Sequence, residues 1–218
     1  MNVLITGCCG FIGSHVVDEF LEAGYTVTGL DNMTYAANGH NIDDASTHPN
    51  FSFVRADIED RLFIAHQVES KNIEYIINLA AETHVDNSIE DCDIFFFTNV
   101  LGVKSLLDVC RELGVKLFHF STDEIYGVAK NKPFIERSNF NPTNPYSASK
   151  AAAEHLVTAY ANTYGVEYMM VRPSNNFGPR QHDEKFLPTI IRKLTANEKI
   201  PVYGQGNQIR EWTYVKDT

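Results

Sequence analysis

Short apolar runs alternate with longer segments of helical periodicity along the chain. The runs are rich in β-branched residues, which is typical of strands buried on both faces of a sheet. Parallel strands need a crossover connection, usually a helix, so the alternation predicts an α/β fold with a doubly wound parallel sheet. The six predicted strands cover residues 3–5, 26–30, 51–54, 75–79, 116–120 and 166–171.

Five segments of helical periodicity lie between or after these runs. A glycine stands just beyond three of the predicted helices, at Gly24, Gly114 and Gly165, where a left-handed residue commonly ends a helix. The polar connections over 36–49 and 130–144 follow predicted strands, at the edge of the sheet where such folds bind ligands. The predicted helices cover residues 11–23, 60–70, 92–113, 145–164 and 185–197.

The composition agrees with a folded protein and excludes several classes. Apolar residues make up 44% of the 218 residues and charged residues 21%, which is close to the globular average. The net charge of −10 is unfavourable for a broad contact with nucleic acid or an anionic membrane. No apolar run approaches the roughly 20 residues of a membrane span, and no basic leader precedes the first predicted strand. We therefore expect a cytoplasmic protein that binds neither nucleic acid nor membranes.

The cysteine pattern predicts reduced thiols. Four cysteines, Cys8, Cys9, Cys92 and Cys110, are too few and too scattered for a disulfide framework. Cys8 and Cys9 are sequence neighbours, but no CxxC spacing and no nearby histidine completes a ligand set. We expect both to be small residues of a turn, and no metal site.

A glycine-rich turn follows the first predicted strand and opens the first predicted helix. Gly7, Gly10 and Gly13 are spaced three apart, which permits a sharp turn and brings backbone N–H groups against a pyrophosphate. Asp31 ends the second predicted strand, where a carboxylate can bind the adenosine ribose and repel a 2′-phosphate. The pattern predicts a dinucleotide site that prefers NAD to NADP. The alternative is a tight structural turn with Asp31 as a helix-capping residue.

Residues after the third and fourth predicted strands extend this expected site. Asp57 and Ile58 follow the third strand, and Leu79, Ala80 and Ala81 follow the fourth, where the adenine and the second ribose would be reached. The small alanines leave room for a cofactor. Close packing against neighbouring elements is the alternative interpretation.

A second constellation predicts proton-transfer chemistry. Tyr146 and Lys150 are four apart on a helix that begins near Pro145, so they share one face. An ammonium group and a cationic nicotinamide nearby would lower the pKa of the phenol, which is otherwise a poor base at neutral pH. Ser121 and Thr122 end the fifth predicted strand and bring hydroxyl groups to the same edge of the sheet.

The chain resembles the extended short-chain dehydrogenase family. Within this family it is most similar to the NAD-dependent nucleotide-sugar epimerases and dehydratases, and above all to the nucleoside-diphosphate-glucose 4,6-dehydratases that act on dTDP-glucose. Thr122-Asp123-Glu124 favours a dehydratase, because the 4-epimerases usually lack the acidic pair. The resemblance rests on residues 6–13 (TGCCGFIG), 78–86 (NLAAETHVD), 121–127 (STDEIYG), 146–151 (YSASKA), 172–179 (RPSNNFGP) and 201–204 (PVYG).

The resemblance implies a lyase reaction with a defined role for each group. Tyr146 would take the proton of the glucose 4-hydroxyl while the C4 hydride passes to NAD, with Thr122 holding the hydroxyl and Lys150 supporting the phenolate. Glu124 would remove the C5 proton and Asp123 would protonate the departing C6 hydroxyl. The product would be a 4-keto-6-deoxy sugar. The alternative is that Asp123 and Glu124 are simply two solvated carboxylates.

The resemblance also implies further contacts and a homodimer formed through the helices over 92–113 and 145–164. The alternatives to such contacts are that Tyr203 is a core residue and that Lys185 is an ordinary solvated residue. Expected cofactor contacts are Gly7, Gly10, Phe11, Ile12, Gly13, Asp31, Asn32, Thr34, Asp57, Ile58, Leu79, Ala80, Ala81, Thr98, Tyr146, Lys150 and Asn176. Expected contacts with the nucleoside-diphosphate sugar are Thr83, Thr122, Asn175, Lys185, Phe186, Pro201, Tyr203 and Arg210.

Two departures from the family pattern bear on activity. Cys8 and Cys9 replace the commoner Gly-Ala of the phosphate turn. Members of the family also run on past the point where this chain stops, so we expect a Rossmann domain over 1–180 and, over 181–218, only the start of a small substrate lobe that is largely missing. A 4-epimerase or decarboxylase, and a noncatalytic NAD-binding fragment, are the alternative functions.

Overall fold

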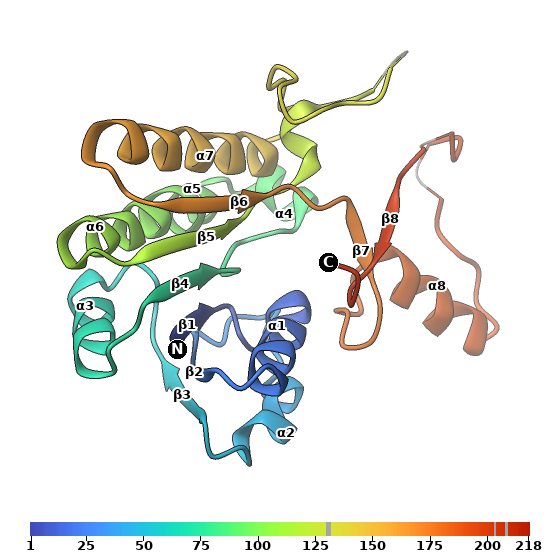
Figure 1. Ribbon diagram of the computed structural model, residues 1–218. Coiled ribbons are helices and arrows are strands. Elements are labelled where there is room, and N and C mark those ends of the chain that lie inside the picture. The colour runs from blue at the N-terminus through green and yellow to red at the C-terminus, as the bar shows by residue number, and fades with distance from the viewer. Residues whose placement is uncertain (130–131, 203, 208) are drawn as a thin grey trace.

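Six parallel strands form one sheet in the order β3-β2-β1-β4-β5-β6 (Figure 1). The computed structural model describes residues 1–129, 132–202, 204–207 and 209–218. The strands are β1 (Asn2–Thr6), β2 (Thr26–Asp31), β3 (Phe51–Arg55), β4 (Tyr75–Asn78), β5 (Lys116–Phe120) and β6 (Tyr168–Val171). This is the doubly wound Rossmann order. The predicted fold class is confirmed, and each predicted strand matches an observed one.

Helices cover both faces of the sheet. Figure 1 shows α1 and α2 on one side and α3, α6 and α7 on the other, and each side has its own buried apolar cluster. The helices are α1 (Phe11–Glu22), η1 (Gly39–Ile42), α2 (Asp43–Ser46), α3 (Arg61–Ser70), α4 (Val85–Glu90), α5 (Asp93–Phe96), the π-helix η2 (Phe97–Gly102), α6 (Val103–Leu113), η3 (Asp123–Tyr126), α7 (Pro145–Tyr164) and α8 (Phe186–Thr195).

Three features differ from the sequence prediction. The predicted helix over 92–113 is divided into α5, η2 and α6, and the predicted connection over 36–49 contains the short helices η1 and α2. The edge strands β3 and β6 are not buried on both faces, since Tyr168 and Met169 are exposed. An edge strand has a neighbour on one side only, so part of its surface stays open to solvent.

The chain reverses its direction of winding between β1 and β4, which lie side by side at the centre of the sheet. Ligands of such folds bind beyond the carboxyl ends of the strands at this point. Gly7 follows β1 with a φ of +68°, and a Cβ there would lie 2.7 Å from the backbone nitrogen of Ala80. Only glycine allows both this left-handed conformation and this approach.

The last part of the described chain lies beside the sheet rather than in it. β7 (Asn175–Phe177) pairs in parallel with β8 (Trp212–Tyr214), and Figure 1 shows α8 next to this pair. α8 has no buried residue, and its apolar side chains Phe186, Ile191 and Leu194 are exposed.

Local signals and one buried ion pair position α7. Asn144 and Ser147 form a capping box at its start, and Gly165 ends it with a φ of +74°. Arg172, just after β6, donates to both carboxylate oxygens of Glu154 at 2.6–3.0 Å. Glu154 is 1% exposed. The pair therefore fixes α7 against the end of β6.

Replacing Arg172 with methionine should lower the free energy of unfolding by about 3 kcal/mol, because the change leaves the Glu154 carboxylate buried without its partner. Urea denaturation measures the effect. The double variant Arg172→Met/Glu154→Leu removes both charges and should recover at least half of the loss. A single variant within about 0.5 kcal/mol of the parent, the range of a neutral surface change, would contradict the structural role of the pair.

Candidate active site

Two adjoining cavities lie beyond the carboxyl ends of β1, β2, β4 and β5. The first, of about 100 Å³, reaches from the end of β2 to the end of β4, and the second, of about 330 Å³, extends to α7 and α8. Both are lined by Gly7, Gly10, Ala36, Leu79 and Ala81. An elongated ligand can therefore span both cavities across the glycine turn.

The glycine turn presents the N-terminus of α1 at the junction of the cavities. Gly10 is the N-cap and supplies no side-chain hydrogen bond to the first turn. Backbone N–H groups at a helix start have no partner within the helix, and they carry the positive end of its dipole. The turn thus offers donors and positive potential where a pyrophosphate would lie, so the residues present fit a dinucleotide.

Asp31 lies at the end of the first cavity and is 7% exposed. Its Oδ2 accepts from the backbone N–H of Cys9 at 2.9 Å, and its Oδ1 accepts from that of Met33 at 2.8 Å. Burial raises the pKa of this carboxyl, while the two N–H groups act in the opposite direction. The carboxylate is oriented by the turn and keeps lone pairs for a ribose hydroxyl.

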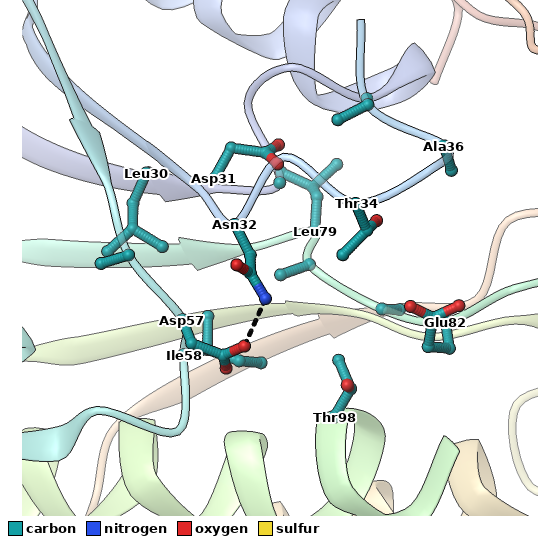
Figure 2. A pocket seen from close by; sticks show the side chains of 16 residues that line it. Leu30, Asp31, Asn32, Thr34, Ala36, Asp57, Ile58, Leu79, Glu82 and Thr98 are labelled. Atoms are coloured by element: carbon teal, nitrogen blue, oxygen red, sulfur yellow. Dashed lines mark hydrogen bonds between the residues drawn. The ribbon is translucent and has the colours of Figure 1, made fainter. Parts of the chain in front are cut away.

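The side of the first cavity toward β3 is built from neighbouring loops. The amide Nδ2 of Asn32 donates to Oδ2 of Asp57, as Figure 2 shows. Ile58 and Thr98 lie nearby, and Thr98 projects from the helical segment on the other side of the cavity. These side chains leave a polar rim around a small apolar floor.

Tyr146 and Lys150 come from the first turns of α7 and line the second cavity. Lys150 is 3% exposed and donates to the Phe120 carbonyl at 2.7 Å. Burial lowers the pKa of Lys150 to about 8, and Glu154 acts against this shift. Burial and then the charge of Glu124 raise the pKa of Tyr146.

From the sequence, we expect the Lys150 ammonium and a cationic nicotinamide together to lower the pKa of Tyr146. Among the described residues, Thr122 favours the phenolate, whereas the Lys150 ammonium is directed to a carbonyl oxygen. Stabilisation of the phenolate thus depends on what binds in the cavity.

The acidic pair lies on η3, directly after β5. Thr122 caps this helix by accepting from the backbone N–H of Glu124 at 3.2 Å. Burial and then the charge of Glu124 raise the pKa of Asp123, while Thr122 and Arg210 act in the opposite direction. These surroundings thus favour the protonated form of Asp123 more than those of a free carboxyl group do.

The structure brings nearly all of the predicted site residues together. All seventeen expected cofactor residues line one of the two cavities, and so do Thr122, Asp123 and Glu124. Of the expected sugar-nucleotide contacts, Pro201 and Arg210 are exposed and do not line either cavity, and Tyr203 lies outside the described residues. The others, Thr83, Thr122, Asn175, Lys185 and Phe186, line the second cavity.

Several lining residues were not predicted. Ser121 was noted only for its position, yet its buried hydroxyl has no hydrogen-bond partner among the described residues and faces the second cavity. Loop residues come close only through the fold: Glu184 lies 3.3 Å from the Lys185 ammonium and 3.7 Å from a ring nitrogen of His84. A single polar residue in a loop gives no sequence signal. The other unpredicted polar residues are Glu82, Ser174, Gln181 and His182.

Within the described part of the chain, none of the helices combines the length and apolar character needed to cross a membrane.

Solved structures show the same architecture. The dTDP-glucose 4,6-dehydratase DesIV from Streptomyces venezuelae, solved with NAD and TYD bound, has a TM-score of 0.96 and 38% identity, and the match covers 100% of this chain and 69% of that one. A UDP-glucose 4-epimerase from Thermotoga maritima has a TM-score of 0.92 and 31% identity, over 100% of this chain and 70% of that one.

The chain is also similar in sequence to curated proteins. The low-salt glycan biosynthesis protein Agl12 of Haloferax volcanii is 43% identical over 100% of this chain and 70% of its own length. A dTDP-glucose 4,6-dehydratase of Xanthomonas campestris pv. campestris is 39% identical over 98% of this chain and 64% of its own. The chain thus spans about two thirds of these relatives.

The family model for NAD-dependent epimerases and dehydratases matches residues 3–218. The resemblance seen in the sequence and the expected cofactor, NAD, are confirmed by this match and by the relatives. The chain belongs to the NAD-dependent epimerase/dehydratase family.

Proposed function

We propose that the chain forms the cofactor-binding part of an NAD-dependent 4,6-dehydratase that converts a nucleoside-diphosphate glucose, dTDP-glucose in particular, to its 4-keto-6-deoxy product. One observation carries this proposal: Asp123 and Glu124 line the same cavity as Tyr146 and Lys150. Elimination of water needs a base at C5 and an acid at the C6 oxygen. A 4-epimerase needs neither, so the acidic pair favours the dehydratase.

NAD would span both cavities, with its pyrophosphate at the N-terminus of α1 and its adenosine ribose at Asp31. When bound, NAD would supply the hydride acceptor for C4 of the sugar and the hydride donor for C6. The chain positions both partners through the glycine turn and through α7.

Tyr146 and Thr122 would handle the 4-hydroxyl. The Thr122 hydroxyl orients the sugar oxygen, and the Tyr146 oxygen accepts its proton. Lys150 is held by the Phe120 carbonyl at the wall of this cavity, where its ammonium can also bind a ribose hydroxyl. Positive charge brought in with the ligand would oppose the effects of burial and of Glu124 on the phenol.

Glu124 and Asp123 would carry out the elimination. The ketone at C4 acidifies the C5–H bond, and the Glu124 carboxylate removes this proton. Asp123, whose pKa is raised by burial and by Glu124, donates a proton to the departing C6 hydroxyl. The environment separates the roles of two neighbouring carboxyl groups, as acid–base catalysis requires.

Residues 181–218 would form the start of the substrate-binding region, after a cofactor domain over 1–180. Lys185 and Phe186 contribute to the second cavity, and Arg210 suits a diphosphate. A homodimer through the predicted helices is supported by the exposed apolar side chains of Phe96, at the end of α5, and Phe97, at the start of η2. The cytoplasmic location stays a prediction.

The proposed function is tested by incubating the protein with several nucleoside-diphosphate glucoses and NAD and identifying the products by mass. We expect loss of one water from the dTDP sugar. A product of unchanged mass with inverted C4 would instead identify a 4-epimerase.

NAD should bind at least tenfold more tightly than NADP, because the Asp31 carboxylate faces the position of the 2′-phosphate; tenfold corresponds to about 1.4 kcal/mol. Titration calorimetry measures both affinities. The variant Asp31→Asn removes the negative charge and should bring the Kd values for NAD and NADP closer together. Equal affinities in the parent protein would place Asp31 away from the ribose.

Glu124→Gln and Asp123→Asn should each lower the rate of dehydration at least a hundredfold, in line with the loss of general acid–base catalysis. Glu124→Gln should also abolish exchange of the C5 hydrogen with solvent deuterium, measured by mass. Glu167→Gln is the matched control, because its carboxylate binds Lys116 on the surface. Wild-type rates in both site variants would refute these roles.

The isolated chain should bind NAD but dehydrate the sugar nucleotide at least a hundredfold less efficiently than a chain extended by the C-terminal segment of a longer relative, about 2.7 kcal/mol in the transition state. Contacts from remote substrate groups align the reacting carbon and exclude water, and the longer relatives have more chain to supply them. The isolated chain and the extended chain should bind NAD with similar affinity. kcat/KM values within a factor of a few would show that 218 residues suffice.

A further inference from the structure

The glycine turn carries two thiols next to a carboxylate. Cys8 and Cys9 follow β1, and Asp31 ends the adjacent strand β2. Their Sγ and carboxylate oxygen atoms all lie within 4.8 Å of one another, and the two sulfur atoms are 3.9 Å apart. Both cysteines are 0% exposed. Three potential ligand atoms of one cation thus converge behind the cofactor cavity.

The spacing suits a tetrahedral soft metal ion. Two sulfur ligands bonded to zinc at about 2.3 Å lie about 3.8 Å apart in a tetrahedron. The separation of the Cys8 and Cys9 sulfur atoms therefore already matches one edge of such a site. Thiolate ligands select zinc-like and softer cations over magnesium or calcium.

The backbone holds the three groups in place. The Cys9 N–H donates to Oδ2 of Asp31 at 2.9 Å, which fixes the carboxylate against the turn. Gly29 on β2 leaves room for the other thiol, because a Cβ there would lie 2.8 Å from Sγ of Cys8. The turn therefore holds the two sulfur atoms and the carboxylate close together.

We propose that Cys8, Cys9 and Asp31 form a binding site for one thiophilic divalent cation, of the class of Zn²⁺ and Cd²⁺, and that occupation of this site excludes NAD. The two S–H bonds are replaced by two metal–sulfur bonds, two protons pass to solvent, and no oxidant is needed. Asp31 supplies one oxygen, and a water molecule or chloride ion completes the coordination.

The exclusion of NAD follows from the shared carboxylate. Asp31 lines the first cavity, where its carboxylate would be the acceptor for the ribose. A cation on this carboxylate takes the lone pairs that the ribose hydroxyls would use. By linkage, each ligand must weaken the other to the same extent.

Cadmium titration of the 218-residue chain tests the site. In the presence of a phosphine reductant, we expect one Cd²⁺ per chain with the ultraviolet charge-transfer band of cadmium thiolate. Cys8→Ser and Cys9→Ser should each weaken Cd²⁺ binding at least tenfold. If one variant fails to fold, the other is sufficient to test the proposal. At a Cd²⁺ concentration ten times its own Kd, the apparent Kd for NAD should rise about tenfold in the parent chain.

Matched thiol controls come from the same chain. Cys92 is exposed, and Cys110 is 1% exposed in the other apolar cluster. Cys92→Ser and Cys110→Ala should retain the cadmium band and the competition with NAD. The proposal is overturned if the band persists in both turn variants, if it disappears with Cys92 or Cys110, or if Cd²⁺ leaves NAD affinity unchanged.

Discussion

The close approach of two backbone segments at the centre of the sheet governs the site. The turn after β1 passes so near the end of β4 that a Cβ on Gly7 would lie 2.7 Å from the Ala80 nitrogen, and the turn needs a left-handed residue at the same position. This contact brings the start of α1 to the junction of the two cavities. It also carries Cys9 to Asp31, whose carboxylate it orients. One turn thus positions both the donors that we propose for the phosphates and the acceptor that we propose for the ribose.

The reacting groups depend on a second, independent set of contacts. Asn99 on the π-helix accepts from the Glu82 N–H at 2.9 Å and donates to the Glu82 carbonyl at 3.0 Å. The same amide donates to the Ser149 hydroxyl on α7 at 2.9 Å. A π-helical turn widens the helix locally and is common at functional sites. Here it joins the loop after β4 to the helix that bears Tyr146, so the two cavities keep a fixed relation.

Sequence patterns predicted the features that depend on residues close together along the chain. Periodicity located the strands and main helices, and the glycines near 7–13 and the YxxxK spacing indicated residues that line the two cavities. Contacts between distant segments left no such signal: the partner of the Lys150 ammonium is a carbonyl on β5, and Glu184 meets His84 across about a hundred residues of chain. For the same reason, the spacing of residues in the sequence indicated no third ligand beside Cys8 and Cys9. The pairing of β1 with β2 brings Asp31 next to them.

Charge explains why the two parts of the site should depend differently on the rest of the chain. The carboxyl groups of Asp123 and Glu124 line the second cavity, in a chain of net charge −10, and ionised carboxyl groups there repel an anionic ligand. The pyrophosphate of NAD is offset by the helix N-terminus within the first fourteen residues. Under the proposed function, the diphosphate of the sugar nucleotide needs its own cations, and two candidates, Lys185 in the cavity wall and Arg210 acting on Asp123, come after residue 180. Under the proposed function, the carboxyl groups that the chemistry requires thus make substrate binding rely on the C-terminal part of the chain, while cofactor binding relies on its beginning.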